Sequence, residues 1–203
     1  MSTDPEKPKR GASKRLTFGM GLEPTGSSPP LLTRTQIDVF YELFYSGMTR
    51  DIAREIEWQR LNPESRVGNM LCALGLVVYT ETLGRVAIRQ LERRYERSPG
   101  EAFWAFFGRM ADGEYARWAK DWQRDHKPLD FFDALRNGLA HEYLPKVRTK
   151  LWFYFGEKFG LGVEPDWDLV LKMEAYHQDF SLAAEALFRE LRTTCVDDRS
   201  PST

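Results

Sequence analysis

One short segment of the chain concentrates the residue types that transfer protons and recognise phosphate. Residues 136–143 have the sequence Arg-Asn-Gly-Leu-Ala-His-Glu-Tyr, and they contain one of the three histidines of the chain. Histidine is the side chain best suited to exchange protons near neutral pH, whereas arginine keeps its charge and matches the geometry of phosphate. Arg136 and His141 together therefore favour phosphodiester chemistry that needs no metal.

The segment falls in a predicted helix that begins near Pro128 and ends near Leu144, before Pro145. At about 100° per residue, the polar residues of this helix fall on one side. They are Asp130, Asp133, Arg136, Asn137, His141 and Tyr143. The opposite side is apolar and is expected to face the core. It carries Phe131, Phe132, Leu135 and Leu139.

An ordinary structural role explains the same residues. An arginine and a histidine at this spacing occur by chance in many chains of this length. Asp133 can pair with Arg136 or Asn137 across one turn of the helix. His141 can be a surface histidine whose hydrogen bonds are satisfied. The geometry of the helix leaves both interpretations open.

The pattern Arg136-Asn137-x-x-x-His141-x-Tyr143 resembles the signature of HEPN domains (higher eukaryotes and prokaryotes nucleotide-binding). That signature is an arginine, often followed directly by a polar residue, and then a histidine, with four to six residues between the arginine and the histidine. The ending His-x-Tyr is similar to the toxin of HEPN–nucleotidyltransferase pairs. The resemblance covers the motif and its helical surroundings, roughly residues 35–192. The chain is longer than the small toxins and has an insertion at residues 151–173.

This resemblance implies a dimeric helical bundle with an endoribonuclease site where two motif helices meet. RNA carries its own nucleophile, the 2′-hydroxyl, so one group must take its proton and another must protonate the leaving 5′-oxygen. A twofold interface supplies two copies of one histidine. His141 is then the base or acid, and Arg136 stabilises charge on the phosphate. Asn137 orients the phosphate or the imidazole. Tyr143 supports the site, and in the toxin subgroup the partner enzyme attaches a nucleotide to the matching tyrosine.

A second class of function fits the same resemblance, namely a non-catalytic HEPN-like domain that binds a protein or a nucleotide. The net charge of −1 favours it, because no overall basic field draws the chain to nucleic acid. For the nuclease interpretation, in a toxin or in antiviral defence, the expected partners are a second copy of the chain and RNA. In the toxin subgroup they include a nucleotidyltransferase antitoxin.

Two features outside the motif can extend the site. Glu81 lies in the most apolar predicted helix, where a carboxylate is costly without a partner. It either faces the motif helix and bonds to Arg136 or His141, or it lies where the helix has reached solvent. Arginines also recur at every fourth position, at Arg85, Arg89, Arg93 and Arg97. The first three of these are candidates for contact with an RNA backbone. Neighbouring glutamates and the helix dipole favour a solvated helix end instead.

Composition limits the remaining possibilities. Cys72 and Cys195 form no disulfide or zinc pattern, and His141-Glu142 has no second histidine at zinc-binding spacing. No segment is expected to be long and apolar enough to cross a bilayer, and the basic N-terminus precedes no apolar leader region. We therefore expect a cytoplasmic protein that uses no metal or other cofactor and contacts no membrane.

The periodicity predicts a mainly α-helical fold with a small β-hairpin and a long loop at residues 147–174. The resemblance implies that the helices form an HEPN-like bundle, with the hairpin inserted before the last helix. Helices are expected after caps at Thr33 or Thr35 and at Thr49, then over residues 65–97, from Pro99 through Trp122, and over residues 175–192. The aromatic residues between Phe103 and Trp122 favour packing in a core or interface over stacking on bases. The domain spans residues 33–192, between predicted disordered tails at 1–32 and 193–203.

Overall fold

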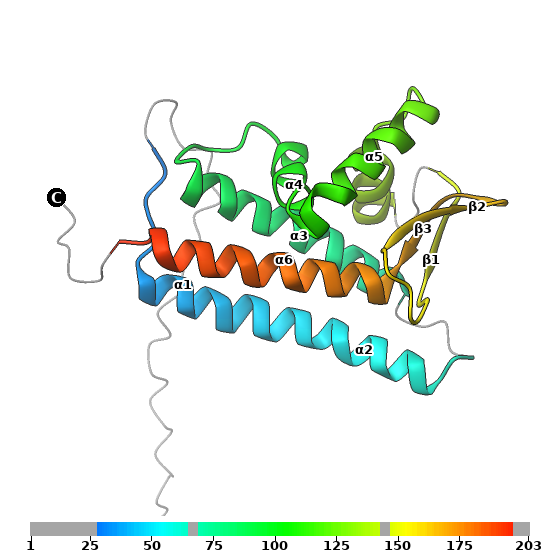
Figure 1. Ribbon diagram of the computed structural model, residues 1–203, viewed down its shortest axis with the longest axis horizontal. Helices are drawn as coiled ribbons and strands as arrows, with labels where there is room; N and C mark the ends of the chain where they lie inside the picture. The colour runs from blue at the N-terminus through cyan, green and yellow to red at the C-terminus, as the bar shows by residue number, and fades with distance from the viewer. Residues whose placement is uncertain (1–27, 65–68, 143–146, 197–203) are drawn as a thin grey trace, which may run out of the picture.

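The computed structural model describes residues 28–64, 69–142 and 147–196, and this part of the chain is mostly helical with one small sheet (Figure 1). The helices are α1 (Arg34–Phe40), α2 (Arg50–Leu61), α3 (Asn69–Leu91), α4 (Pro99–Phe107), α5 (Glu114–Asp125) and α6 (Met173–Thr194). Two π-helices, η1 (Tyr41–Thr49) and η3 (Asp133–Glu142), and the 3-10 helix η2 (Met110–Gly113) lie between them. The strands are β1 (Thr149–Trp152), β2 (Leu161–Glu164) and β3 (Trp167–Lys172).

The first helical run is continuous from α1 through η1 to α2. It begins at Thr33, whose hydroxyl accepts a hydrogen bond from the Gln36 backbone while the Gln36 side chain bonds back to Thr33. Thr49 was expected to cap a second helix, and this prediction was wrong. The Thr49 hydroxyl donates to the carbonyl of Tyr45 inside the run, so the hydroxyl satisfies a helical carbonyl and the helix continues.

Helix α3 lies at the centre of the fold and contacts α4, α6 and η3. Its side chains Leu76, Val77, Leu83 and Ile88 are fully buried. Gly84 allows α4 to approach closely, because a Cβ there would lie 1.6 Å from the carbonyl oxygen of Ala102. The helix ends at Leu91, six residues earlier than predicted. The first helical run and α3 both lie alongside α6 (Figure 1).

The expectation that no segment could cross a bilayer was wrong by length and composition. Residues Met70–Leu91 of α3 form a stretch long and apolar enough to span one, even with Glu81, Arg85 and Arg89 inside it. In the described structure 56% of its most apolar part is buried within the protein. A core helix meets the same criterion, because burial and membrane insertion both select apolar residues.

The predicted long aromatic helix is two helices. Helix α4 ends at Phe107, and Ala111, Asp112 and Gly113 have positive φ values of 44°, 52° and 81° before α5 begins. This left-handed turn redirects the chain, since such a conformation cannot continue a right-handed helix. The expectation that these aromatics pack in the core is confirmed for most of them, since Phe103 and Phe107 are among those that are buried, whereas Trp104 and Trp118 are partly exposed.

A three-stranded sheet replaces the predicted simple hairpin. Strands β2 and β3 form an antiparallel hairpin, and β1 pairs in parallel with β3 to give the order β1-β3-β2. Gly160 packs against α5 and α6, because its N–H donates to the Tyr115 hydroxyl at 2.9 Å and a Cβ would collide with Tyr176. The sheet therefore packs on the bundle instead of projecting from it.

Helix α6 follows β3 directly and confirms the predicted apolar stripe. Its buried residues include Tyr176, Phe180, Ala183, Leu187 and Leu191. The fold extends beyond the predicted domain limits at both ends. The backbone N–H of Leu32 donates to Gln90 Oε1 at 2.8 Å, and Val196 forms a parallel bridge with Thr33.

Candidate functional site

The motif helix begins later than predicted and in a different geometry. Leu129 bonds to the carbonyl of His126 in a turn, and helix begins at residue 131. Asp130 caps it, because its Oδ1 accepts from the N–H of Asp133 at 2.9 Å. Pro128 therefore lies before the helix and not in its first turn. The expected apolar side is confirmed, since Phe131, Leu135 and Leu139 are fully buried.

From Asp133 onward the motif helix is a π-helix. A π-helix closes its hydrogen bonds between residues i and i+5, and positions 136 and 141 are five residues apart. The backbone at position 141 therefore lies about one turn beyond Arg136. The angle between the two positions around the helix axis is smaller than the angle of about 140° that an α-helix would give. The structure describes only the backbone at Asn137 and His141, and Tyr143 lies outside the described residues.

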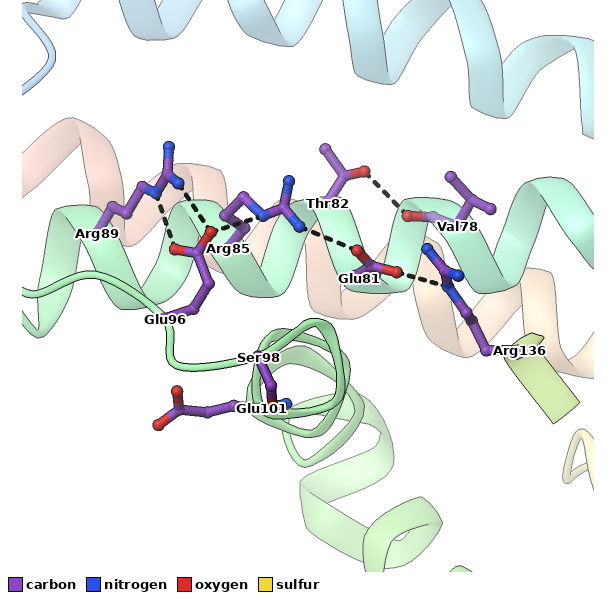
Figure 2. Close-up of polar contacts among 9 residues, drawn as sticks. All are labelled: Val78, Glu81, Thr82, Arg85, Arg89, Glu96, Ser98, Glu101 and Arg136. Atoms are coloured by element: carbon purple, nitrogen blue, oxygen red, sulfur yellow. Dashed lines mark hydrogen bonds and ion pairs between the residues drawn. The ribbon is translucent and has the colours of Figure 1, made fainter. Parts of the chain in front are cut away.

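Arg136 binds a carboxylate of the central helix. Its Nε donates to Glu81 Oε2 at 2.8 Å, and its guanidinium carbon lies 5.9 Å from the centre of the Phe132 ring. The Arg136 side chain is 19% exposed and that of Glu81 is 9% exposed. The proposed partnership of Glu81 with the motif helix is thus confirmed, and Figure 2 shows the contact.

Glu81 is one link in a row of alternating charges along α3 (Figure 2). Its other oxygen accepts from Arg85 at 3.0 Å. Glu96, in the loop after α3, lies 2.8 Å from Arg85 Nε and accepts from Arg89 at 2.7 and 2.9 Å. We call these five residues the Arg136 cluster. Their side chains are between 9% and 27% exposed, so their mutual attraction is screened less than that of surface pairs.

The predicted stripe of four arginines along one helix was wrong. Arg93 has a φ of 58° and lies beyond the end of α3, so it does not continue the row of Arg85 and Arg89. Those two arginines are neither a solvated helix end nor an open track for RNA, because Glu81 and Glu96 bind them. Arg97 also lies in the loop. The sequence predicted glutamates next to these arginines on one helix, whereas in the structure α3 has already ended and Glu96 reaches Arg85 and Arg89 from the loop.

Sequence reasoning also missed a shallow hollow of about 470 Å³ at the beginning of the motif helix. It is lined by Trp104, Lys120, Gln123, Arg124, Lys127 and Asp130. These residues come from α4, α5 and the connection to η3, so no single periodic pattern marks them. Asp130 joins the hollow to the motif helix that it caps.

The other two histidines bond to main-chain carbonyls. A ring N–H of His126 donates to the carbonyl of Trp122 at 2.8 Å, and the two rings stack with centres 4.3 Å apart. His177 donates from Nε2 to the carbonyl of Thr49 at 3.2 Å, and burial lowers the pKa of this imidazole. Within the described ranges, no group of three or more His, Cys, Asp and Glu side chains could hold a metal ion.

Comparison with known proteins finds no matching family model, no matching curated protein and no matching solved structure. The resemblance to HEPN domains therefore depends on residues 136–143 and on the helical surroundings.

Proposed function

We propose that this protein is a metal-independent endoribonuclease whose site forms around Arg136 and His141 where two copies of the motif helix meet. The ion pair of 2.8 Å between Arg136 and Glu81 is the observation that carries the proposal. A guanidinium held through Nε by a nearly buried carboxylate is already oriented before substrate binds. Such preorganisation is what electrostatic stabilisation of a transition state requires.

The reaction assigns one role to each group. One His141 takes the proton of the RNA 2′-hydroxyl, and the 2′-oxygen attacks the adjacent phosphorus. The bond from phosphorus to the 5′-oxygen breaks, and the second His141 donates a proton to that oxygen. Arg136 stabilises the negative charge on the non-bridging oxygens, an effect of about 3 kcal/mol, while Asn137 orients the phosphate. The products are a 2′,3′-cyclic phosphate and a 5′-hydroxyl end.

The number and placement of histidines support a site shared by two copies. His126 and His177 bond to the carbonyls of Trp122 and Thr49. His126 lies at the end of α5 and His177 lies on α6, so both are outside the motif helix. A single chain thus offers one histidine in the motif, whereas the reaction uses an acid and a base. An isologous dimer provides the second, because the same patch meets itself across the twofold axis.

A second candidate is a non-catalytic HEPN-like domain that binds a protein or a nucleotide. The specific observation in its favour is that Arg136 is only 19% exposed and takes part in an extended ion-pair cluster. In this alternative the motif arginine joins η3 to α3 and contributes to folding alone.

Cleavage of RNA by the purified full-length chain in EDTA separates the two functions. We expect the wild type to produce 2′,3′-cyclic phosphate ends and to be a dimer by light scattering. His141→Ala should lower the rate by at least about 100-fold, the typical contribution of general acid–base catalysis. His126→Ala is the matched control.

The controls define the outcomes that contradict the proposal. Circular dichroism establishes that each variant is folded before its rate is compared. Intact RNA with folded dimeric wild type would refute the nuclease and leave the binding domain. Equal rates for wild type and His141→Ala would assign the cleavage to a contaminant. A monomer that cleaves RNA would refute the shared site.

A further inference from the structure

The hollow at the beginning of the motif helix combines an aromatic ring with cations. Trp104 comes from α4, Lys120 and Gln123 come from α5, and Lys127 lies in the connection that leads to η3. Contacts between aromatic rings place the hollow next to the motif helix. The Trp104 ring lies 5.9 Å from Phe131, the first residue of the motif helix, and Arg136 lies in the next turn.

Among the described residues, two of the three cations in this hollow lack the carboxylate partners that the arginines of the Arg136 cluster have. Lys120 and Lys127 are exposed, and neither has an ion-pair partner among the residues that the structure describes. Arg124 is different, since Asp121 and Asp125 lie 3.0 and 3.6 Å from its guanidinium. The remaining charged residue of the lining, Asp130, is acidic, so the lining holds three cations and one carboxylate and is locally basic on a chain whose net charge is −1. A local excess of cations is what binding to a phosphate backbone requires.

The walls of the hollow are ordered by contacts with the core. The indole of Trp104 is partly exposed, and Phe103 and Phe107 hold it in edge contacts at 5.7 and 5.5 Å. The side-chain oxygen of Gln123 accepts from the N–H of Phe131 at 3.5 Å. A ring that is already oriented loses little conformational entropy when a ligand stacks on it.

We propose that this hollow binds single-stranded RNA. One unpaired base stacks on Trp104, and Lys120 and Lys127 bind the phosphates on either side, with the amide of Gln123 at the base edge. An unpaired base exposes the face that stacks on an aromatic ring, whereas a duplex keeps its bases stacked on each other. The choice of RNA as the ligand rests on the proposed nuclease function. The geometry of the hollow is independent of that proposal.

Binding of a short oligonucleotide with 2′-O-methyl groups tests this site without cleavage, because the nucleophile is blocked. Fluorescence anisotropy gives its Kd. We expect Trp104→Ala to raise the Kd at least about fivefold, the effect of losing one stacked base. Trp104→Leu keeps an apolar side chain and should weaken binding similarly. Trp58→Ala is the control, because Trp58 is 44% exposed on α2, away from the hollow.

The lysines are tested by the salt dependence of the same Kd. Each phosphate contact to single-stranded nucleic acid contributes about 0.7 to the slope of log K against log salt concentration. The double variant Lys120→Gln/Lys127→Gln should therefore lower the slope by about 1.4. Lys158→Gln, an exposed lysine in the connection between β1 and β2, should leave it unchanged.

The outcomes distinguish this site from the proposed nuclease. Binding that needs Trp104, in a protein that never cleaves RNA, would support the hollow and refute the nuclease. Cleavage and binding that survive both Trp104 variants would refute the hollow alone. Equal affinity for duplex RNA, or equal competition by a polyglutamate peptide of the same charge, would also overturn single-stranded RNA as the ligand.

Discussion

The Arg136 cluster and the hollow lined by Trp104 both place cations next to the motif helix, but the cations are paired with carboxylates in the cluster, whereas within the described part of the chain the two lysines of the hollow are not. In the cluster, carboxylates of Glu81 and Glu96 bind three arginines in a partly buried row. In the hollow, Lys120 and Lys127 face solvent without a described carboxylate partner. Arginine suits the first environment because its planar group binds carboxylates with fixed geometry, while lysine suits a solvated one. The comparison separates charge that orders the fold from charge that is available to a ligand.

The largest effect should follow from removing the centre of the cluster. Glu81→Ala leaves Arg85 and Arg136 partly buried without their shared carboxylate. We expect a loss of about 3 kcal/mol in the free energy of unfolding, the lower end for broken buried pairs because Arg136 is 19% exposed. Urea denaturation measures it. Glu57→Ala is the control, since this carboxylate is 58% exposed beside Arg60 and should cost less than about 0.5 kcal/mol.

A double substitution sharpens the same prediction. Replacing the pair by apolar side chains in Glu81→Leu/Arg136→Met should recover much of the lost stability, because the cost arises mainly from the charge left unpaired. Equal destabilisation by Glu81→Ala and Glu57→Ala would show that the cluster contributes no more than an exposed pair. The distinction drawn between the two regions would then be lost.

The two regions also differ in how far the sequence predicts them. The cost of a carboxylate among apolar residues of α3 predicted that Glu81 either binds the motif helix or reaches solvent, and the contact with Arg136 decides for the first. Glu96 could not be placed, because its contacts with Arg85 and Arg89 depend on where α3 ends and how the next loop returns. The hollow was missed for a similar reason, since the left-handed turn at Ala111 and Asp112 decides how α4 meets α5.

The fold shows the same division between periodic and non-periodic features. The apolar stripe of α6 and the buried side of the motif helix followed from residue spacing. The π-helical hydrogen bonds of η3 did not, because residue types do not reveal whether a turn closes at i+4 or i+5. The parallel pairing of β1 with β3 joins segments about 20 residues apart, and hydrophobic alternation carries no information on such pairing.

A pH titration extends the comparison to His177, a largely buried ionisable group whose described partner is the backbone carbonyl of Thr49. Burial lowers the pKa of His177 below its usual 6.5, so the folded protein resists protonation that the unfolded chain accepts. Stability is therefore fully present above pH 6.5 and falls as the pH drops toward the lowered folded pKa. The loss is at most about 1.4 kcal/mol per pH unit.

Urea denaturation at pH 7.5 and 5.5 measures this loss, and His177→Gln should reduce the difference between the two pH values. His126→Gln serves as the control. The glutamine amide can still donate to the carbonyl of Thr49, so the variant removes the titration while keeping the hydrogen bond. An unchanged pH dependence would assign the acid sensitivity to other groups.

The smallest effect is expected where the charge is exposed and unpaired. Lys120→Gln/Lys127→Gln should change the free energy of unfolding by less than about 0.5 kcal/mol, because neither side chain has a described ion-pair partner whose loss would leave a buried charge. The same variant should lower the salt dependence of RNA binding. A stability loss comparable to that of Glu81→Ala would mean that these lysines order the fold, and the hollow would then be a second structural cluster instead of a surface for RNA.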